Sequence, residues 1–372
     1  MQKQAPCIPP ALPVTDLDWR RLIPLVGKAN AAMARYDGML QALPNPAVLL
    51  SPITANEAVL SSRIEGTQAT LEEVLQQDAG IEQAQSRRAD IEEISNYRAA
   101  MRDAEQALAH RPLSLSLIKG VHQRLMQGVR GSDKTPGEFR IEQNWIGRHD
   151  SPMSEARFVP PNPMVLPQAL DAWASYLAAE DEDPVLQVAI AHAQFEILHP
   201  FKDGNGRIGR MLIPLLLFQR KTLSRPMYYL SEYLESHRDL YYDGLLAITA
   251  NGNWQGWIEF FLNAIVVQAD ANLIKVKQMF ELYYTLKQRF IESTHSQFAV
   301  PALDAFFTRP IINATDFSQL AGIENRMTAN GILSQIKQDK LIIRLRESSG
   351  RTPAVFALPD LINIAEGRKV IE

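Results

Sequence analysis

The stretch that decides the fold is residues 199–210, with the sequence HPFKDGNGRIGR. It separates two strongly apolar segments, whose i, i+3, i+4 spacing predicts helices over 184–198 and about 207–220. Gly204 and Gly206 let the backbone turn with exposed N–H groups, which meet the positive end of the second helix. The sequence therefore predicts an anion-binding site between two buried helices.

The polar side chains of this stretch suit a nucleotide with more than one phosphate. Arg207 and Arg210 lie one turn apart, and each can bind phosphate oxygens through two N–H groups. Asn205 adds a side-chain donor, and Asp203 supplies the single carboxylate that commonly holds Mg2+ together with phosphates. His199 ends the first helix, and its neutral imidazole near pH 7 can take a proton from a hydroxyl group. The pattern indicates a di- or triphosphate site beside a general base.

A structural interpretation of each residue alone stays open. Gly204 to Gly206 could form a simple turn, and His199 could be a histidine at a helix end. Seven glycine and polar positions within twelve residues favour the functional interpretation. His192 lies among apolar neighbours with no such loop, and we interpret it as a packed core histidine.

The stretch resembles the signature loop of the Fic (filamentation induced by cAMP) family, His-x-Phe-x-Asp/Glu-Gly-Asn-Gly-Arg-x-x-Arg, at every position. The resemblance extends in organisation over about residues 10–265. It implies a Fic-type helical bundle and protein AMPylation, in which AMP passes from ATP to a Tyr, Ser or Thr hydroxyl and pyrophosphate leaves. It also implies that His199 is the catalytic base and that Asp203 binds Mg2+. By the same resemblance, the residues that bind ATP are Gly204, Asn205, Gly206, Arg207, Ile208, Gly209, Arg210, Tyr241 and Tyr242.

The two tyrosines come from a Tyr-rich stretch, residues 226–242, that resembles the nucleotide-side helix of the family. Tyr241 and Tyr242 could line the adenosine pocket. Tyrosines at helical spacing are also typical of a core, so both interpretations stay open.

A helix before the loop carries a second motif. Capping boxes begin at Thr54 and Thr70, and Gly66 can stop the chain between them, which predicts a helix over about 54–66. Ser61 and Glu65 are four residues apart and share one face of that helix. Glu65 stands at its negative end, which is unfavourable for a carboxylate.

A solvated Glu65 without a partner is one interpretation of this position. Residues 61–66, SSRIEG, also resemble the Fic inhibitory motif Ser/Thr-x-x-x-Glu-Gly/Asn. The resemblance implies that Glu65 binds Arg210, so that this arginine cannot hold the γ-phosphate and the free enzyme is autoinhibited.

Residues 144–161 fit the flap that the family places over its site. Extended pieces over 143–146 and 156–159 predict a hairpin, whose edge could pair with an extended segment of a target protein. A plain surface hairpin is the alternative. The flap residues that could reach the nucleotide are Ile146, Gly147, Arg148 and His149.

The whole chain is helical nearly throughout, which predicts an all-α fold with a small flap hairpin and a C-terminal winged-helix domain. Further helices are predicted over 16–42, 87–109, 113–127, 165–180, 236–265 and 265–293. The predicted domains are an N-terminal helical region (1–110) with the inhibitory helix, a catalytic core (111–265), a helical linker (266–300) and a winged-helix-like domain (301–372).

The last domain rests on three short helices, over 304–308, 315–321 and 324–339, followed by a strand–turn–strand over 341–358. Between residues 324 and 351, six Lys and Arg side chains oppose three Asp and Glu side chains, a net charge of +3. DNA contact, protein docking and dimerisation are all consistent with such a module. The alternative function is a DNA-binding regulator whose Fic core only senses nucleotide.

Composition sets the outer bounds. The chain has 372 residues, 46% hydrophobic and 22% charged, with a formal net charge of −4. These values exclude a disordered chain. The net charge does not indicate that the chain as a whole binds nucleic acid or a membrane surface. The one cysteine, Cys7, excludes an intramolecular disulfide framework. With no signal-peptide pattern and apolar runs of only about eight residues, we expect a cytoplasmic protein without a membrane partner.

Overall fold

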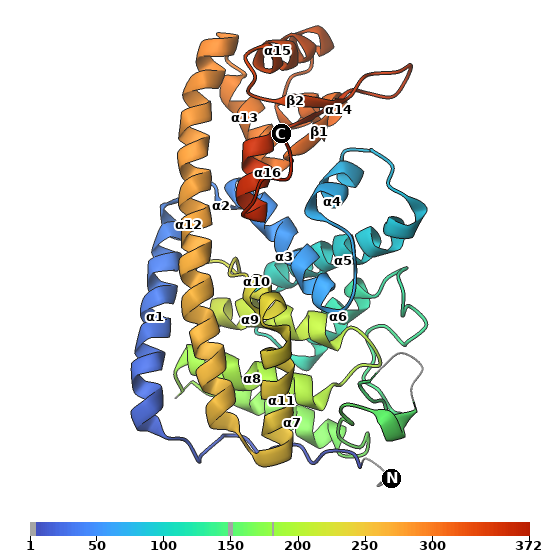
Figure 1. The fold of residues 1–372 in the computed structure, drawn as a ribbon, viewed down its shortest axis with the longest axis vertical. Coiled ribbons are helices and arrows are strands. Elements are labelled where there is room, and N and C mark those ends of the chain that lie inside the picture. Colours follow the sequence, from blue (N-terminus) through green and yellow to red (C-terminus); the bar gives the residue numbers. More distant parts are fainter. Residues whose placement is uncertain (1–4, 148–151, 181) are drawn as a thin grey trace. The chain divides into compact units, whose positions relative to one another are not determined.

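The computed structural model describes residues 5–147, 152–180 and 182–372. Over these residues the protein has sixteen α-helices, one 3-10 helix and one three-stranded sheet (Figure 1), which confirms the predicted helical fold class. The chain forms two compact units. Unit 1 comprises Met1–Asp37, Leu60–Gly66 and Asn96–Asp270, and unit 2 comprises Gly38–Val59, Thr67–Ser95 and Ala271–Glu372. The predicted domain boundaries near residues 110, 265 and 300 remain predictions.

Helices α8 (Pro184–Leu198) and α9 (Asn205–Gln219) form the centre of unit 1 and pack side by side (Figure 1). The Asp183 carboxylate caps α8 by accepting the backbone N–H groups of Val185 and Leu186, at 3.0 and 3.1 Å. Both helices are buried on nearly every side, which explains why they are apolar all round rather than along one stripe.

Three further helices of unit 1 pack on this pair. α7 (Leu166–Ala178) and α11 (Arg238–Asn251) contact α8, and α6 (Leu115–Leu125) contacts α9. Trp173 and Trp257 donate their indole N–H groups to α8 carbonyls, at 2.9 and 2.8 Å. These contacts hold α8 and α9 rigidly around the short connection that carries the signature loop.

Two of the helix boundaries that differ from the prediction bear on the organisation of the chain. α12 (Trp254–Thr294) is one helix of 41 residues, so the predicted break at 265 is wrong, and the chain turns instead at Gly252, whose φ is +68°.

α12 is also long and apolar enough to cross a membrane by length and composition alone, with half of its most apolar window buried inside the protein. The same properties describe the core helix of a soluble protein, so this feature carries no membrane assignment.

The predicted start of the inhibitory helix at Thr54 is the second correction. α3 (Ser51–Ile64) begins earlier, and the Thr54 hydroxyl donates to the Leu50 carbonyl at 3.1 Å instead of capping a helix. The second capping box is confirmed, because Thr70 and Glu73 bond reciprocally at the start of α4 (Leu71–Asp78). Gly66, with φ +104°, turns the chain between the two helices.

The remaining helices before α12 in the sequence are α1 (Trp19–Ala42), α2 (Pro46–Leu49), α5 (Gln85–Leu108) and α10 (Ser231–Ser236).

The C-terminal part of unit 2 has the order α13 (Ala299–Thr308), β1 (Ile311–Asn313), α14 (Ala314–Leu320), α15 (Arg326–Gln338), β2 (Ile343–Arg346), β3 (Val355–Ala357) and α16 (Pro359–Glu366). The strands form an antiparallel sheet in the order β1-β3-β2. The sequence pattern did not predict β1 or α16. The winged-helix assignment of this region stays a prediction.

The predicted flap hairpin is shorter in the structure. Among the described residues, Ile146 and Phe158 form a single antiparallel bridge. A 3-10 turn at Met153–Glu155 lies between these two residues in the sequence. Gly147 follows the bridge directly, whereas Arg148 and His149 lie outside the described residues. A long ladder is absent here because the proline-rich segment 160–163 has few donors to extend it.

Candidate functional site

The signature loop starts with a left-handed residue. His199 follows the last residue of α8 and has φ 45° and ψ 59°, so the chain reverses at the histidine itself. Such backbone angles are uncommon outside glycine, although histidine adopts them more readily than most residues. The turn aims the loop back toward the start of α9, and it needs support from neighbouring groups.

Arg140 supplies much of that support. Its guanidinium donates to the carbonyls of His199 at 2.9 Å, Pro161 at 2.6 Å and Leu198 at 3.3 Å. Its backbone N–H donates to the Pro200 carbonyl at 2.8 Å. The residue is only 2% exposed, and the carbonyls of Leu198 and His199 belong to the negative end of α8, where a cation is favourable. Arg140 therefore fixes the backbone on both sides of His199.

Asn205 closes the loop on itself. Its side-chain oxygen accepts the Phe201 N–H at 2.8 Å, and its side-chain nitrogen donates to the Phe201 carbonyl at 2.9 Å. The donor that the sequence suggested for a phosphate is therefore used to hold the loop. Gly204, with φ +75°, supplies the turn before α9.

His122 on α6 holds the other side of the loop. Its Nδ1 accepts the Gly137 N–H at 2.8 Å, so the ring proton lies on Nε2, which donates to the Asp203 carbonyl at 3.0 Å. The ring stacks on Phe201 with centroids 3.7 Å apart. Burial lowers the pKa of His122 to about 4, which agrees with a neutral ring that donates and accepts at once.

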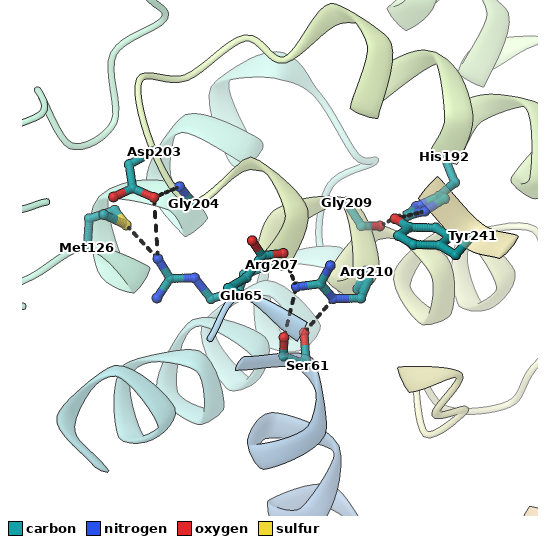
Figure 2. A network of polar contacts seen from close by, with 10 residues as sticks. All are labelled: Ser61, Glu65, Met126, His192, Asp203, Gly204, Arg207, Gly209, Arg210 and Tyr241. Atoms are coloured by element: carbon teal, nitrogen blue, oxygen red, sulfur yellow. Dashed lines mark hydrogen bonds and ion pairs between the residues drawn. The ribbon is translucent and has the colours of Figure 1, made fainter. Parts of the chain in front are cut away.

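Asp203 is the carboxylate that the sequence assigned to Mg2+. Its Oδ1 accepts the Gly204 N–H at 2.6 Å and lies 3.8 Å from an Nη of Arg207, and its side chain stays 42% exposed (Figure 2). No group of three His, Cys, Asp or Glu residues that could hold a metal occurs within the described residues. A lone exposed carboxylate beside an anion-binding turn fits Mg2+ that receives its other ligands from phosphates and water.

Arg210 is buried and fully engaged. It donates to the Ser61 hydroxyl and to the Ser61 carbonyl, both at 2.9 Å, and to Glu65 Oε1 at 2.7 Å (Figure 2). The Glu65 side chain is 32% exposed, and that of Arg210 is 1% exposed. Burial favours the protonated carboxyl, but the charge and hydrogen bond of Arg210 outweigh it and lower the pKa of Glu65. The pair is therefore ionised at neutral pH.

Glu65 also lies directly over the first turn of α9. A Cβ atom built on Gly206 would stand 2.2 Å from Glu65 Oε1, so only glycine leaves room for this carboxylate. The Glu65 carboxylate extends from the C-terminal end of α3, where a negative charge is unfavourable, to the N-terminal end of α9, where backbone N–H groups attract an anion. The carboxylate thus lies where the N-terminus of α9 attracts an anion.

His199 faces the same region in its neutral form. Burial and then the positive charge of Arg140 lower the pKa of His199 from 6.5 to about 4, while Glu65 opposes this shift. Its Nδ1 has no hydrogen-bond partner among the described residues. The imidazole is held in place through its backbone and remains available as a proton acceptor.

Comparison with known proteins now identifies the family. The model described as "Fic/DOC family N-terminal" matches residues 23–106, and the "Fic/DOC family" model matches residues 112–217, together just over half of the chain. The chain belongs to the Fic/DOC family. The resemblance of the loop 199–210 is thereby confirmed at the level of the family.

Curated relatives carry adenylyltransferase names. The chain is 30% identical over 173 residues to "Protein adenylyltransferase Fic" of Aedes aegypti, which is 45% of this chain and 31% of that protein. It is 30% identical over 128 residues to a "Probable protein adenylyltransferase" of Aquifex aeolicus, which is 34% of this chain and 37% of that protein. The chain thus matches about a third of the length of these relatives.

Solved Fic structures share the fold. A Fic family protein from Desulfovibrio desulfuricans G20 has a TM-score of 0.59 at 22% identity, covering 94% of this chain and 98% of that one. Fic-1 from C. elegans has a TM-score of 0.51 at 20% identity, covering 70% of this chain and 76% of that one. The first of these similarities extends over nearly the whole chain.

The two tyrosines predicted for the Fic nucleotide pocket lie in different surroundings. Tyr241 is buried, and its hydroxyl donates to Nε2 of His192 at 3.0 Å, while Nδ1 of His192 donates to the Gly209 carbonyl at 2.9 Å (Figure 2). His192 is a buried histidine as predicted, and it also ties α11 to the loop helix. Tyr242 is partly exposed and lines a small cavity with the flap residues Ile146, Arg157 and Phe158.

Glu196 is a site residue that sequence reasoning missed. Burial raises the pKa of Glu196 to about 8, so it is mostly protonated at neutral pH. Its Oε1 is buried without a hydrogen-bond partner among the described residues, and a Cβ on Gly209 would lie 2.0 Å from it. A carboxyl on the otherwise apolar helix 184–198 was the available signal.

Arg140 and His122 were also missed. Arg140 lies in an irregular segment without periodicity, and His122 lies on the buried stripe of an amphipathic helix. Their contacts join segments that are far apart in sequence, so only the tertiary structure could identify them.

Proposed function

We propose that this Fic protein is a protein adenylyltransferase. It would transfer AMP from ATP to a Tyr, Ser or Thr hydroxyl of a target protein, and also to a hydroxyl of this chain itself. The observation that carries the proposal is a neutral imidazole, His199, held next to a helix N-terminus with two buried arginines, Arg207 and Arg210. The adenylyltransferase names of the relatives support it at the family level.

In the proposed reaction, His199 takes the proton of the target hydroxyl as its oxygen attacks the α-phosphorus of ATP. A P–O bond forms to the target, the bond from the α-phosphorus to the bridging oxygen breaks, and pyrophosphate leaves with that electron pair. The first turn of α9 and Arg207 and Arg210 would hold the phosphates. Negative phosphates near His199 raise its pKa above the low value of the free protein, which strengthens the base when ATP is bound.

Mg2+ would be held by Asp203 together with the phosphates, and it would supply positive charge against the leaving pyrophosphate. The chain's own contribution is the fixed position of that carboxylate. His122 holds the Asp203 carbonyl, and Gly204 donates to the Asp203 side chain.

Glu65 acts as the brake in this proposal. With Arg210 paired to Glu65 and Ser61, the arginine cannot hold the γ-phosphate, and the carboxylate over Gly206 repels an incoming phosphate. ATP would then bind, if at all, in an unproductive pose.

The target would dock along the flap, residues 144–161. An extended target segment that pairs with an edge of the flap beside the Ile146–Phe158 bridge would bring its hydroxyl toward His199. A second copy of this chain is one such target, which would appear as self-modification.

Parallel incubations with α-labelled and γ-labelled ATP test the proposal, using the Glu65→Gly variant to remove the brake. Label retained from the α position alone supports AMP transfer, and mass spectrometry should find peptides with one added AMP. Label from the γ position alone indicates kinase chemistry. Absence of both labels, with nucleotide still bound, favours the alternative of a nucleotide-sensing regulator.

A further inference from the structure

Unit 2 contains a wide groove that the proposed AMP transfer does not use. Its walls are α14, α15 and the β2–β3 connection, and its volume is about 790 Å³. We name it the C-terminal groove and define it by six of its lining residues: Arg326, Asn330, Ser334, Lys337, Arg344 and Arg351. In Figure 1 the β2–β3 connection extends outward beyond the strands that it joins.

Positive charge dominates this groove. Four of its lining residues are Arg or Lys, and Glu324 is the one carboxylate among them. Arg344 is paired with Glu347, whereas Arg326, Lys337 and Arg351 form no ion pair with any residue that the structure describes. Three uncompensated cations around one concavity attract a polyanion, even though the whole chain is slightly acidic.

The spacing of the cations on α15 suits a duplex. Arg326 and Lys337 stand at the two ends of the helix, eleven residues apart, which is about 16 Å along its axis. The major groove of B-DNA is about 12 Å wide, so a helix lying in it brings side chains at its two ends to the two phosphate strands. Asn330 and Ser334 lie between them on the same side, and both residue types can bond to base edges.

We propose that the C-terminal groove binds double-stranded DNA, with α15 in the major groove and Arg351 of the β2–β3 connection on the adjacent phosphates. A protein partner is less favoured, because the core of a protein interface is depleted in charged residues and enriched in aromatic side chains. The exposed side chains of this groove are instead Asn, Ser, Thr, Gln, Arg and one Glu, and Lys337 is half-buried. The proposal is independent of the AMP-transfer proposal.

Fluorescence anisotropy of the full chain with a labelled 30-base-pair duplex pool of random sequence, in 50 to 200 mM NaCl, tests it. Three phosphate contacts, from Arg326, Lys337 and Arg351, predict that the association constant falls about 40-fold over this range, with a log–log slope near −2.7. The double variant Arg326→Ala with Arg351→Ala should lose about two thirds of that slope and fall only about 3- to 4-fold. Arg289→Ala, which removes an exposed, unpaired cation of α12 outside the groove, is the matched control and should bind like the wild type.

A second variant separates binding from folding. Asn330→Ala should keep or raise the thermal stability of the chain, because alanine favours the helix more than asparagine does, yet weaken the DNA complex by removing a polar side chain of the groove. DNA binding unaffected by Asn330→Ala overturns the assignment of α15 as the contact face. No binding at 50 mM NaCl, or an equal salt slope in the groove variants, overturns the proposal.

Two alternative occupants are distinguished by the same protein samples. If inorganic phosphate displaces the duplex far more effectively than NaCl of equal ionic strength, the groove is a site for free phosphate and not for DNA. If the groove variants change the oligomeric state by light scattering while DNA binding stays unaltered, the groove is an interface between copies of this chain.

Discussion

The two ends of the loop 199–210 are held by different kinds of contact. At the α8 end, Arg140 bonds to the backbone carbonyls of His199 and Leu198, and no carboxylate of a described residue takes part. At the α9 end, Arg210 bonds to the carboxylate of Glu65, which follows the last residue of α3. The backbone bonds leave no charged group for a ligand to replace, whereas in the proposed function a phosphate replaces the Glu65 carboxylate on Arg210. The proposed function therefore divides the loop into a permanent catalytic end and a switchable binding end.

The largest effect should come from the permanent end. In the Glu65→Gly background, His199→Ala should lower AMP transfer about 10²- to 10⁴-fold, because no other base is positioned at the loop. Transfer is measured with α-labelled ATP. The exposed His110 provides the control, since His110→Ala should leave the rate unaltered. Equal rates for the His199 variant and its parent would remove the basis of the proposed mechanism.

Arg140→Met should lower transfer about 10²-fold in the same background, since a small misplacement of a reacting group has effects of that size. It should also shift the pH profile. The charge of Arg140 lowers the pKa of His199, so its loss raises that pKa and moves the acid limb of the profile to a higher pH than in the parent. A merely structural role would lower the rate without this shift. Arg35→Met, which breaks an exposed ion pair with Asp270, is the control.

At the switchable end, Glu65→Gly should raise transfer about 5- to 150-fold, the range of a coupling of about 1–3 kcal/mol. Glu65→Gln keeps the size of the side chain and removes its charge, so it should give an intermediate rise. Ser61→Ala loses one bond to Arg210 but keeps Glu65, and its rise should be smaller still. A Glu65→Gly rate no higher than that of the wild type would refute the brake.

Gly206→Ala should break the same contact from the other side. Its Cβ would stand 2.2 Å from Glu65 Oε1, so the wild-type background should lose stability, while the Glu65→Gly background should lose much less. A double-mutant cycle by urea unfolding should give an interaction energy of about 0.5–3 kcal/mol. Additive effects of the two substitutions would mean that the carboxylate does not lie over this glycine in solution.

The smallest effect concerns pH. The pKa of Glu65 is lowered in the folded chain, so its ion pair stabilises the fold fully above the unfolded pKa of about 4.5 and less as pH falls through the lowered value. The difference in unfolding free energy between wild type and Glu65→Gln should stay level from pH 8 to 5 and then shrink. Because Glu65 is 32% exposed, we expect a difference of about 1 kcal/mol or less. A difference that grows toward low pH would contradict the sign.

Local signals in the sequence predicted a good part of this site. The stretch 199–210 identified the turn, the two arginines and the family, and the bounds of α8 agree with the predicted 184–198. The spacing of Ser61 and Glu65 predicted a shared face, and both residues contact Arg210. One prediction failed at Thr54. Its capping pattern predicted a helix start, but α3 already begins at Ser51, so Thr54 lies inside the helix.

The sequence by itself determined the helical class, the anion-binding turn and the residue types around it, because periodicity and glycine placement act over a few residues. Only the tertiary structure decided that Arg140 and His122 hold the turn, that Asn205 closes it, and that the Glu65 carboxylate lies over Gly206. Except for the Asn205 contact with Phe201, these contacts join residues many positions apart, and all their energies depend on burial and on which backbone groups lack partners. Neither quantity exists until the chain has folded.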